Sequence, residues 1–447
     1  MKEEVFKVDL HLDTRYVVTC PSKSLGRFAR NIDSECPRDV TIPMNAVGEH
    51  GNCRGAFLSA PLVRSVRQRN DKSVVDAKLD YGRSLSLTGA RLLTILAAGL
   101  STGALILDWT GGRSLFSNTS IALPLLLCAL ITAGLGYWAV PVLQALKMGQ
   151  IIREDGPKTH LRKAGTPTMG GIFFILVAVA VALIWSGLVM QGQDFIPVLA
   201  VSIVTLGYAG IGLIDDWQIV RRRSNKGISP RLKLTLQIVV GSLFCLWLAW
   251  SQPANITTIN LPLNLVLPLG LLFWPVAVFA LVAESNATNL TDGVDGLAAG
   301  TCAIALLGLA ALVGPTSPGL MIFCACLSGS CLGFVVHNRN PATVFMGDTG
   351  SLALGGALAA VGLLSQNLWG LFILSAIFFV EVVSVIAQVG YYKATKDQSG
   401  IGRRLFKMSP FHNHLELSGW AETRIVGVFY LVNALLALLC LATKAGI

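Results

Sequence analysis

Residues 195–216, FIPVLAVSIVTLGYAGIGLIDD, decide the fold, because an uncharged run ends at the paired carboxylates Asp215 and Asp216. About 20 apolar residues in a helix cross the ~30 Å hydrocarbon core of a bilayer. The chain of 447 residues is 53% apolar and only 13% charged, unlike an ordinary soluble domain. Helices satisfy their own backbone in lipid, so we predict an all-α polytopic membrane protein. Eleven apolar stretches are long enough, or nearly so, to span the bilayer: 91–108, 121–146, 166–189, 195–214, 232–250, 264–284, 295–314, 319–336, 349–365, 368–390 and 426–443.

The distribution of charge predicts the orientation. The net charge of +10 does not require nucleic acid, because cytoplasmic loops of polytopic proteins carry an excess of Lys and Arg. After residue 109, Arg113 and Lys444 alone lie on one side of the predicted membrane. The polar segments that follow odd-numbered spans hold nearly all the reactive side chains, and we expect them on the cytoplasmic face. The remaining Lys and Arg concentrate in the loops 147–165, 215–233, 337–348 and 391–425.

The chain divides by composition into three parts. Residues 1–90 form a polar tail, residues 91–120 an extra apolar segment with its loop, and residues 121–447 the main membrane domain. The tail contains an Arg-rich, acid-free stretch at 51–70, so a transit peptide and a disordered cytosolic tail both stay open. A bacterial-type plasma membrane is the default location, and a plastid membrane fits if the tail is a transit peptide.

The first two polar segments combine cations with carboxylates. Lys163 and Thr168 lie at the start of a span in a glycine-rich stretch, an arrangement that binds anions at a helix N-terminus or simply caps the helix. Asp215 and Asp216 repel each other beside an apolar core unless a cation accompanies them. Lys233 follows them, after a basic run that membrane anchoring largely explains.

The next two segments offer oxygen ligands. Asn289, Asp292 and Asp295 lie in NLTDGVDG (289–296), which is too short for an EF-hand and also suits helix capping. Phe345 can stack on a base or pack in the core. Asp348, three residues later and beside Gly347, can approach a metal ion without steric obstruction.

The fifth segment contains His412, His414 and Glu416. The spacing suits metal ligation, although two imidazoles beside acids can also bind phosphate or transfer protons near neutral pH.

Five motifs together resemble the phospho-N-acetylmuramoyl-pentapeptide-transferase family, which makes lipid I in peptidoglycan synthesis. They are GTPTMGG (165–171), Asp215–Asp216, NLTDGVDG (289–296), FMGD (345–348) and SPFHNHLE (409–416). The resemblance runs from about residue 121 to the C-terminus and identifies residues 121–447 as a transmembrane glycosyl-phosphate transferase domain. It implies ten family helices, with 91–108 as an additional one, and commonly a homodimer.

The resemblance also implies an activity. Phospho-MurNAc-pentapeptide moves from UDP-MurNAc-pentapeptide to undecaprenyl phosphate at a cytoplasmic, Mg²⁺-dependent site, and UMP is released. Direct attack by the lipid phosphate and an aspartyl intermediate both stay open. The implied metal ligands are Asp348 and Asp292, and the residues implied to act on the metal or the phosphates are Asp215, Asp216 and Lys233. Phe345 is implied to stack on uracil, with Lys163, Thr168, Asn289, Asp292, Gly293, Asp295, Asn338 and Gln388 around the nucleotide, and His412 and His414 near the sugar phosphate.

Two residues depart from the family pattern. Asn413 replaces the middle histidine of a triple histidine, and Ile219 replaces a lysine after the paired aspartates. Asn can donate and accept hydrogen bonds but carries no proton. Because the flanking histidines remain, we predict that activity survives.

Two other functions share some of these sequence features. A related transferase that moves HexNAc-1-phosphate to a polyprenyl phosphate shares the paired aspartates, but the final segment, 410–420, favours the muramoyl-pentapeptide substrate. A secondary transporter would hold its ionisable groups near the bilayer midplane. Here the acids lie at span ends, with Glu381 as the main deeper exception.

Overall fold

The computed structural model describes residues 6–8, 16–18, 87–146, 163, 165–191, 194–222, 224, 227–262 and 265–445. The chain divides into two units, Met1–Ser84 and Leu85–Ile447. In the first unit, strand β1 (Phe6–Val8) pairs antiparallel with β2 (Tyr16–Val18). The predictions made for the tail, residues 1–90, otherwise fall almost entirely outside the described residues.

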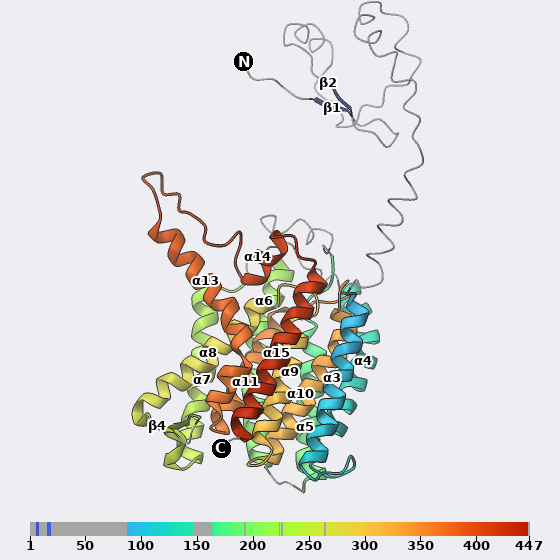
Figure 1. Ribbon diagram of the computed structural model, residues 1–447, viewed down its shortest axis with the longest axis vertical. Coiled ribbons are helices and arrows are strands. Elements are labelled where there is room, and N and C mark those ends of the chain that lie inside the picture. Colours follow the sequence, from blue (N-terminus) through green and yellow to red (C-terminus); the bar gives the residue numbers. More distant parts are fainter. Residues whose placement is uncertain are drawn as a thin grey trace, which may run out of the picture. The chain divides into compact units, whose positions relative to one another are not determined.

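The described part of the second unit is a helical bundle (Figure 1). Ten segments in it are long and apolar enough to cross a membrane, and α9 is a shorter apolar helix. This confirms the prediction of an all-α polytopic membrane protein. The helices that form these segments are α3 (Gly89–Thr110), α4 (Ala122–Ala145), α5 (Gly171–Ile184) with η4 (Trp185–Val189), α6 (Phe195–Arg222), α7 (Pro230–Ser251), η6 (Gly270–Leu272) with α8 (Phe273–Thr291), α10 (Pro318–Asn338), α11 (Gly347–Leu364), α13 (Ala376–Ala394) and α15 (Glu422–Ala445).

Smaller elements complete the unit: η5 (Ala254–Thr257), β3 (Thr258–Asn260) paired antiparallel with β4 (Val266–Pro268), α9 (Leu297–Val313), α12 (Leu368–Leu374) and α14 (Phe411–Leu417).

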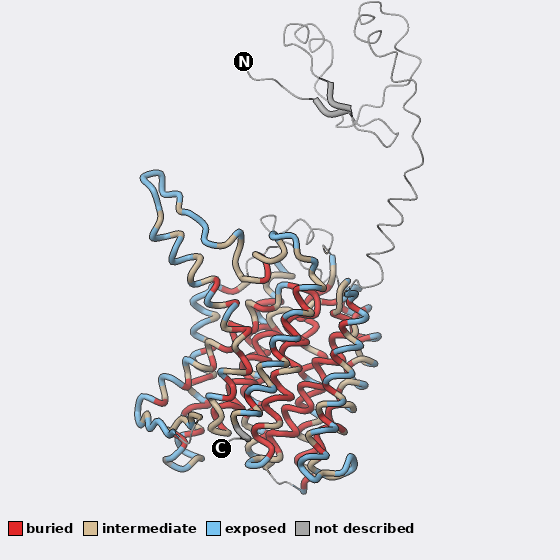
Figure 2. Tube along the Cα trace, in the orientation of Figure 1, coloured by how far each residue is buried: buried red, intermediate tan, exposed pale blue. Residues whose placement is uncertain are grey.

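Helices α9, α10 and α11 form the buried centre of the bundle (Figure 2). Helix α10 packs against α4, α9 and α5, and α11 packs against α6 and α8. Small residues allow this, because membrane helices associate closely where Gly, Ala and Ser let the backbones approach. A Cβ atom at Gly329 of α10 would overlap the backbone of Leu125 in α4. Helices α10 and α11 therefore lie in close contact with their neighbours.

Helix α3 belongs to this bundle. Its residues Leu92, Leu96, Leu100 and Ala104 are buried at a helical spacing. At its end the Asp108 carboxylate accepts hydrogen bonds from the backbone N–H groups of Ile121 and Ala122, at 2.8 and 3.0 Å, where α4 begins. Helix α3 is thus joined to α4 through a capped turn.

One expected span is broken. Residues 368–390 were expected to form one helix, but the structure has α12 and α13 with Ser375 between them. The Ser375 hydroxyl donates a 2.6 Å hydrogen bond to Glu284 Oε1 of α8 inside the bundle. This buried contact holds the chain at the break.

Several polar segments expected as loops are helical. Helix α8 was expected to end at residue 284 but continues to Thr291, and α6 continues past residue 214 to Arg222. The extensions form because their polar side chains find partners in neighbouring helices. Thr288 Oγ1, for example, donates to the Ser351 carbonyl of α11 at 2.8 Å. Asp215, Asp216 and Asn289 therefore lie on helices, beyond the ends expected for those spans. Asp348, expected in the loop 337–348, lies in the first turn of α11.

Candidate active site

The centre of the site is the ammonium group of Lys233, which lies between two carboxylates. Its Nζ atom is 3.4 Å from Asp215 Oδ2 and also donates to Asp348 Oδ2. The other Asp348 oxygen accepts a 2.8 Å hydrogen bond from Asn289 Nδ2. Four helices, α6, α7, α8 and α11, thus supply one polar cluster at the ends that carry the motifs. Because all three ionisable groups are largely buried, their charges act on one another with little screening.

Asp216 contacts the first turn of α11, unlike its neighbour Asp215, which faces Lys233. Its Oδ1 accepts from the Asp348 backbone N–H at 3.1 Å, and its Oδ2 accepts from the Thr349 N–H and hydroxyl at 2.9 and 2.7 Å. Free N–H groups in the first turn of a helix need such acceptors, and a negative charge there also suits the helix dipole. Asp216 therefore caps α11 and fixes where Asp348 stands.

A close approach of α6 to α11 makes this cap possible. A Cβ atom at Gly212, one turn before the aspartates, would overlap the backbone carbonyl of Asp348. Glycine at this position lets the two helices come close enough for the Asp216 carboxylate to reach the end of α11.

The first and fourth polar segments are joined through their backbones. The Phe345 N–H donates to the Pro167 carbonyl at 2.8 Å, and the Gly170 N–H donates to the Phe345 carbonyl at 2.9 Å. Thr168 is buried beside Gly347, so it lies under the turn that leads to Asp348. The Phe345 side chain is half-buried on this pair of segments.

The third and fifth segments also meet. A Cβ atom at Gly293 would overlap Nε2 of His412, so this nitrogen faces the turn between Asp292 and Asp295. Glu381 of α13 holds the histidine from its other side: its Oε1 accepts from the His412 backbone N–H at 3.2 Å, and its Oε2 is 3.2 Å from Nδ1. Both side chains are buried, so the imidazole has one fixed orientation.

A second charged cluster lies beside the first. Lys163 Nζ is 2.8 Å from Asp295 Oδ1 and 2.7 Å from Glu422 Oε2 of α15. Asn340 Nδ2 donates to both acids, at 3.2 and 3.1 Å. Burial alone would lower the pKa of Lys163, but the charges of Asp295 and Glu422 outweigh it and raise the pKa above its usual value. In this structure Lys163 is thus a charged residue that forms ion pairs with Asp295 and Glu422.

Two of the candidate nucleotide ligands also have internal partners. Asn338 is buried, accepts from the Gly296 N–H at 2.9 Å and donates to the Val344 carbonyl at 2.9 Å. Gln388 Oε1 accepts from the Phe406 N–H at 2.8 Å and its Nε2 donates back to the Phe406 carbonyl at 3.1 Å, which anchors the last loop on α13.

His414 lies further out than His412. Its ring stacks on Phe411 with the centroids 5.8 Å apart, and its Nδ1 accepts from the Lys407 N–H at 3.2 Å. Between the two histidines, Asn413 is buried on α14.

Asp292 differs from every other acid in the site. No hydrogen bond or ion pair from the described residues reaches its half-buried carboxylate. Burial, together with the negative charges of Asp348, Asp216 and Asp295, raises the pKa of Asp292 to about 8. The arrangement holds more negative charge than its lysine neutralises, and a cation would relieve it. Among the described residues, no three His, Cys, Asp or Glu side chains converge on one point that could hold a metal ion.

The structure thus brings together Asp215, Asp216, Lys233, Asn289 and Asp348, and beside them Asp292, Gly293, His412, Lys163 and Asp295. Sequence reasoning missed Glu422, Asn340 and Ser351 as members of the site. Ser351 Oγ accepts from Asn289 Nδ2 at 2.9 Å, next to the Asp348 contact. Ser351 lies one helical turn after Gly347, a spacing that could have placed it on the same face as the cluster.

The chain is similar to known proteins over most of its length. Residues 198–366 match glycosyl transferase family 4, and residues 163–175 match the phospho-N-acetylmuramoyl-pentapeptide-transferase signature 1. A phospho-N-acetylmuramoyl-pentapeptide-transferase from Nostoc sp. is 64% identical over 373 residues, which are 83% of this chain and 100% of that protein. The chain belongs to the phospho-N-acetylmuramoyl-pentapeptide-transferase family. The transferase from Gloeothece citriformis is 65% identical (79% of this chain, 95% of that protein), and that from Synechocystis sp. is 57% identical (80% and 96%).

The family similarity extends beyond the motifs. The part of this chain that the Nostoc transferase leaves unmatched is shorter than the segment before Gly89. Helix α3 therefore lies within the part shared with this transferase, and the similarity begins well before residue 121. These relatives are cyanobacterial, and the chain, like a family member, is a multi-pass membrane protein.

Proposed function

We propose that this chain transfers phospho-N-acetylmuramoyl-pentapeptide from its UDP-activated form to undecaprenyl phosphate, which gives lipid I and UMP. The observation that carries the proposal is the cluster of Asp215, Lys233, Asp348 and Asn289 at the ends of four helices. In the overall reaction a lipid phosphate oxygen bonds to the sugar-linked phosphorus, and the bond from that phosphorus to the oxygen of UMP breaks. Helix ends at the membrane surface are where a soluble nucleotide and a membrane-held phosphate can meet.

The main barrier is electrostatic, because the nucleotide pyrophosphate and the lipid phosphate are both anionic. Preorganised positive charge in a site with little water stabilises the charge that develops as phosphate groups approach. Lys233 supplies such a charge, and Asp215 and Asp348 hold its ammonium group between them. We assign to Lys233 the role of binding the phosphates where they meet.

Mg²⁺ fits the acids that remain. The partnerless carboxylate of Asp292 and the neighbouring carboxylate of Asp348 would hold it, since Mg²⁺ usually takes one or two carboxylates, substrate phosphates and water. When bound, it would supply Lewis-acid stabilisation of the phosphate oxygens. Asp216 supports this pair by fixing the first turn of α11.

The nucleotide would bind along the joined first and fourth segments. Phe345 would stack on the uracil ring, as the family resemblance implies, because its side chain is part-exposed and its backbone is fixed on both sides. Thr168, Asn289 and Gly293 would contact the nucleotide near Asp348, since Asn289 bonds to Asp348 and Thr168 lies beside Gly347. Lys163, Asp295, Asn338 and Gln388 would act as positioning residues, since their polar atoms already hold neighbouring segments together.

The histidines would serve the sugar-linked phosphate. Glu381 fixes the orientation of His412, so that Nε2 faces Gly293 and can hold or release a proton there. His414, held by Phe411 and the backbone of Lys407, would bind phosphate from the outer side.

The direct test is Mg²⁺-dependent UMP release from UDP-MurNAc-pentapeptide in the presence of undecaprenyl phosphate. We expect Asp348→Asn to lose at least about 100-fold in turnover, because Asp348 holds the Lys233 ammonium group and would hold the metal ion, and both cations stabilise developing charge. The control is Asp397→Asn, which changes an exposed carboxylate in the last loop and should keep activity. Equal activity of wild type and Asp348→Asn would remove the assignment.

The same assay separates the alternative function. Product formed only from a UDP-HexNAc donor would favour a polyprenyl-phosphate HexNAc-1-phosphate transferase. We also expect a homodimer, which light scattering of the purified protein measures.

A further inference from the structure

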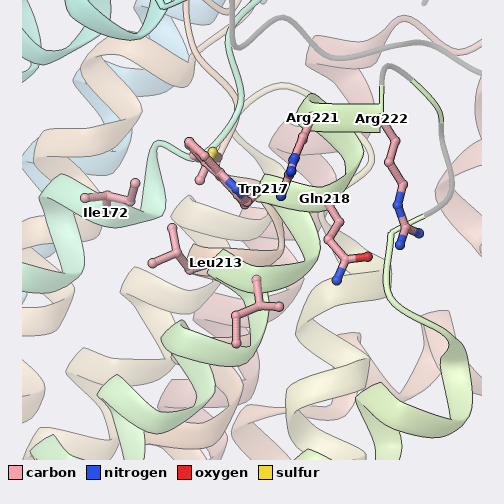
Figure 3. Close-up of a pocket in the computed structure, with 8 residues that line it drawn as sticks. Ile172, Leu213, Trp217, Gln218, Arg221 and Arg222 are labelled. Carbon is pink, nitrogen blue, oxygen red and sulfur yellow. The ribbon is translucent and has the colours of Figure 1, made fainter.

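A cavity of about 780 Å³ opens beside α6 (Figure 3). Its walls are the start of α5 and the last turns of α6. Trp217, Ile214 and Leu213 are between 38% and 52% exposed, so they border the lipid around the bundle rather than its core. The residues that line it are Met169, Ile172, Leu213, Ile214, Trp217, Gln218, Arg221 and Arg222.

Helix α6 has two functional faces. Leu213, Trp217 and Arg221 follow one another at intervals of four, the spacing of one helical face. Asp215 and Asp216 are instead buried against α7 and α11. Arg222 lies at the border of the two sides, because it donates to the Gly227 carbonyl at 3.3 Å and a Cβ atom at Gly227 would overlap Asp215 Oδ1. A molecule in the cavity would therefore touch the same helical turns as the catalytic pair, mainly from the side of Leu213 and Trp217.

The positive charge of the cavity lining favours an anionic ligand. Two arginines lie at the cytoplasmic end of an otherwise mostly apolar lining, and the lining contains no acidic side chain. Guanidinium groups bind phosphates through paired hydrogen bonds, and basic pockets on the cytoplasmic side of membrane helices attract anionic headgroups. Trp217 stands between the apolar wall and the arginines, the level at which tryptophan is enriched in membranes.

We propose that this cavity binds an anionic phospholipid of the surrounding membrane, with its phosphate at Arg221 and Arg222 and its acyl chains along Leu213, Ile214 and Ile172. Undecaprenyl phosphate shares the required chemistry. It is the less suitable occupant, because its phosphate must reach Asp348 on the other side of α6. The bound phospholipid would steady the last turns of α6, which hold the catalytic pair.

Quenching of Trp217 fluorescence by brominated lipids tests the proposal. The protein is reconstituted in phosphatidylcholine vesicles with increasing fractions of brominated phosphatidylglycerol or, in parallel, brominated phosphatidylcholine. The signal of the Trp217→Phe variant is subtracted, so that only this residue is reported. We expect half-maximal quenching at a lower fraction of phosphatidylglycerol, since each basic residue at the surface favours anionic lipid by about fivefold.

Two variants provide the matched comparison. Arg221→Gln should reduce the preference for phosphatidylglycerol by about fivefold. Arg231→Gln, which removes an exposed charge at the start of α7 and does not line the cavity, should leave it unchanged. Equal quenching by both lipids, or equal effects of the two variants, would overturn the proposal. So would displacement of brominated phosphatidylglycerol by stoichiometric undecaprenyl phosphate, which would assign the cavity to the substrate.

Discussion

The carboxylate of Asp216 accepts both the backbone N–H and the hydroxyl of Thr349, at 2.9 and 2.7 Å, so one member of the aspartate pair is a helix cap. Asp215, its neighbour in sequence, instead faces Lys233 at 3.4 Å. Asp216 thus stabilises α11, whereas Asp215 contacts the lysine of the candidate site. We therefore expect variants at the two positions to lose activity for different reasons.

Replacing Asp216 should lower stability and activity together. In Asp216→Asn, an amide replaces one acceptor oxygen at the start of α11, and loss of a helix cap costs about 1 kcal/mol. Asp348 then loses its fixed position, so we expect turnover to fall at least about tenfold. Thermal unfolding and UMP release measure the two effects. Thr349→Val, which keeps the backbone N–H, should show the smaller change in both. A full loss of activity with unaltered thermal stability would contradict the capping role.

Replacing Lys233 should separate metal binding from turnover. Its ammonium group occupies the position between Asp215 and Asp348, so a neutral side chain leaves two carboxylates without compensation. We expect Lys233→Met to bind Mg²⁺ more tightly than wild type, because the ion no longer competes with a fixed positive charge. Turnover should nevertheless fall by about 100-fold, since the phosphates lose that charge. Calorimetric titration with Mg²⁺ and the UMP assay provide the two measurements. Weaker Mg²⁺ binding in the variant would show that the lysine organises the metal site instead.

The affinity for Mg²⁺ should rise with pH. With its pKa raised to about 8, Asp292 is mostly protonated at pH 7, and the ion must displace that proton. Above pH 8 the carboxylate is already ionised and the competition ends. The apparent affinity should therefore increase about tenfold between pH 7 and 8.5 and then level off.

Proton release gives an independent measure of the same competition. Calorimetry in two buffers of different ionisation enthalpy should report close to one proton released per ion at pH 7 and almost none at pH 9. Asp292→Asn should abolish the pH dependence. If the variant keeps the wild-type dependence, another group carries the proton.

Glu381 and His412 should behave as one unit. The carboxylate orients the imidazole, so we expect Glu381→Gln to lower kcat by about 10- to 100-fold, within the usual contribution of acid–base catalysis, with little change in KM. Because the two residues act together, the double variant Glu381→Gln/His412→Gln should lose no more than His412→Gln alone. Additive losses in the cycle would mean that Glu381 acts independently of the histidine.

The fold and the residues of the candidate site could be predicted from the sequence, but the geometry of the site could not. Long apolar runs define helices directly, and the alternation of polar segments correctly placed the motifs at one end of the bundle. The boundaries were less predictable, because Asn289 and Asp215 extend their helices only by finding partners in α11 and α7. No local pattern reveals that Asp216 caps another helix, or that Lys163 pairs with Glu422 at the start of α15. Such contacts join residues far apart in the chain, and a single sequence carries no record of them.

The backbone pairing of Pro167 with Phe345 has a consequence for biogenesis. Helices α5 to α10 lie between these residues, so the two segments cannot pair until all six helices have been synthesised. A contact that closes so long a loop forms late, because the loss of chain entropy is offset only after the intervening helices have packed. During synthesis the proposed nucleotide site would therefore stay incomplete before α10 is in place, and the newly inserted protein would remain inactive until its bundle is nearly whole.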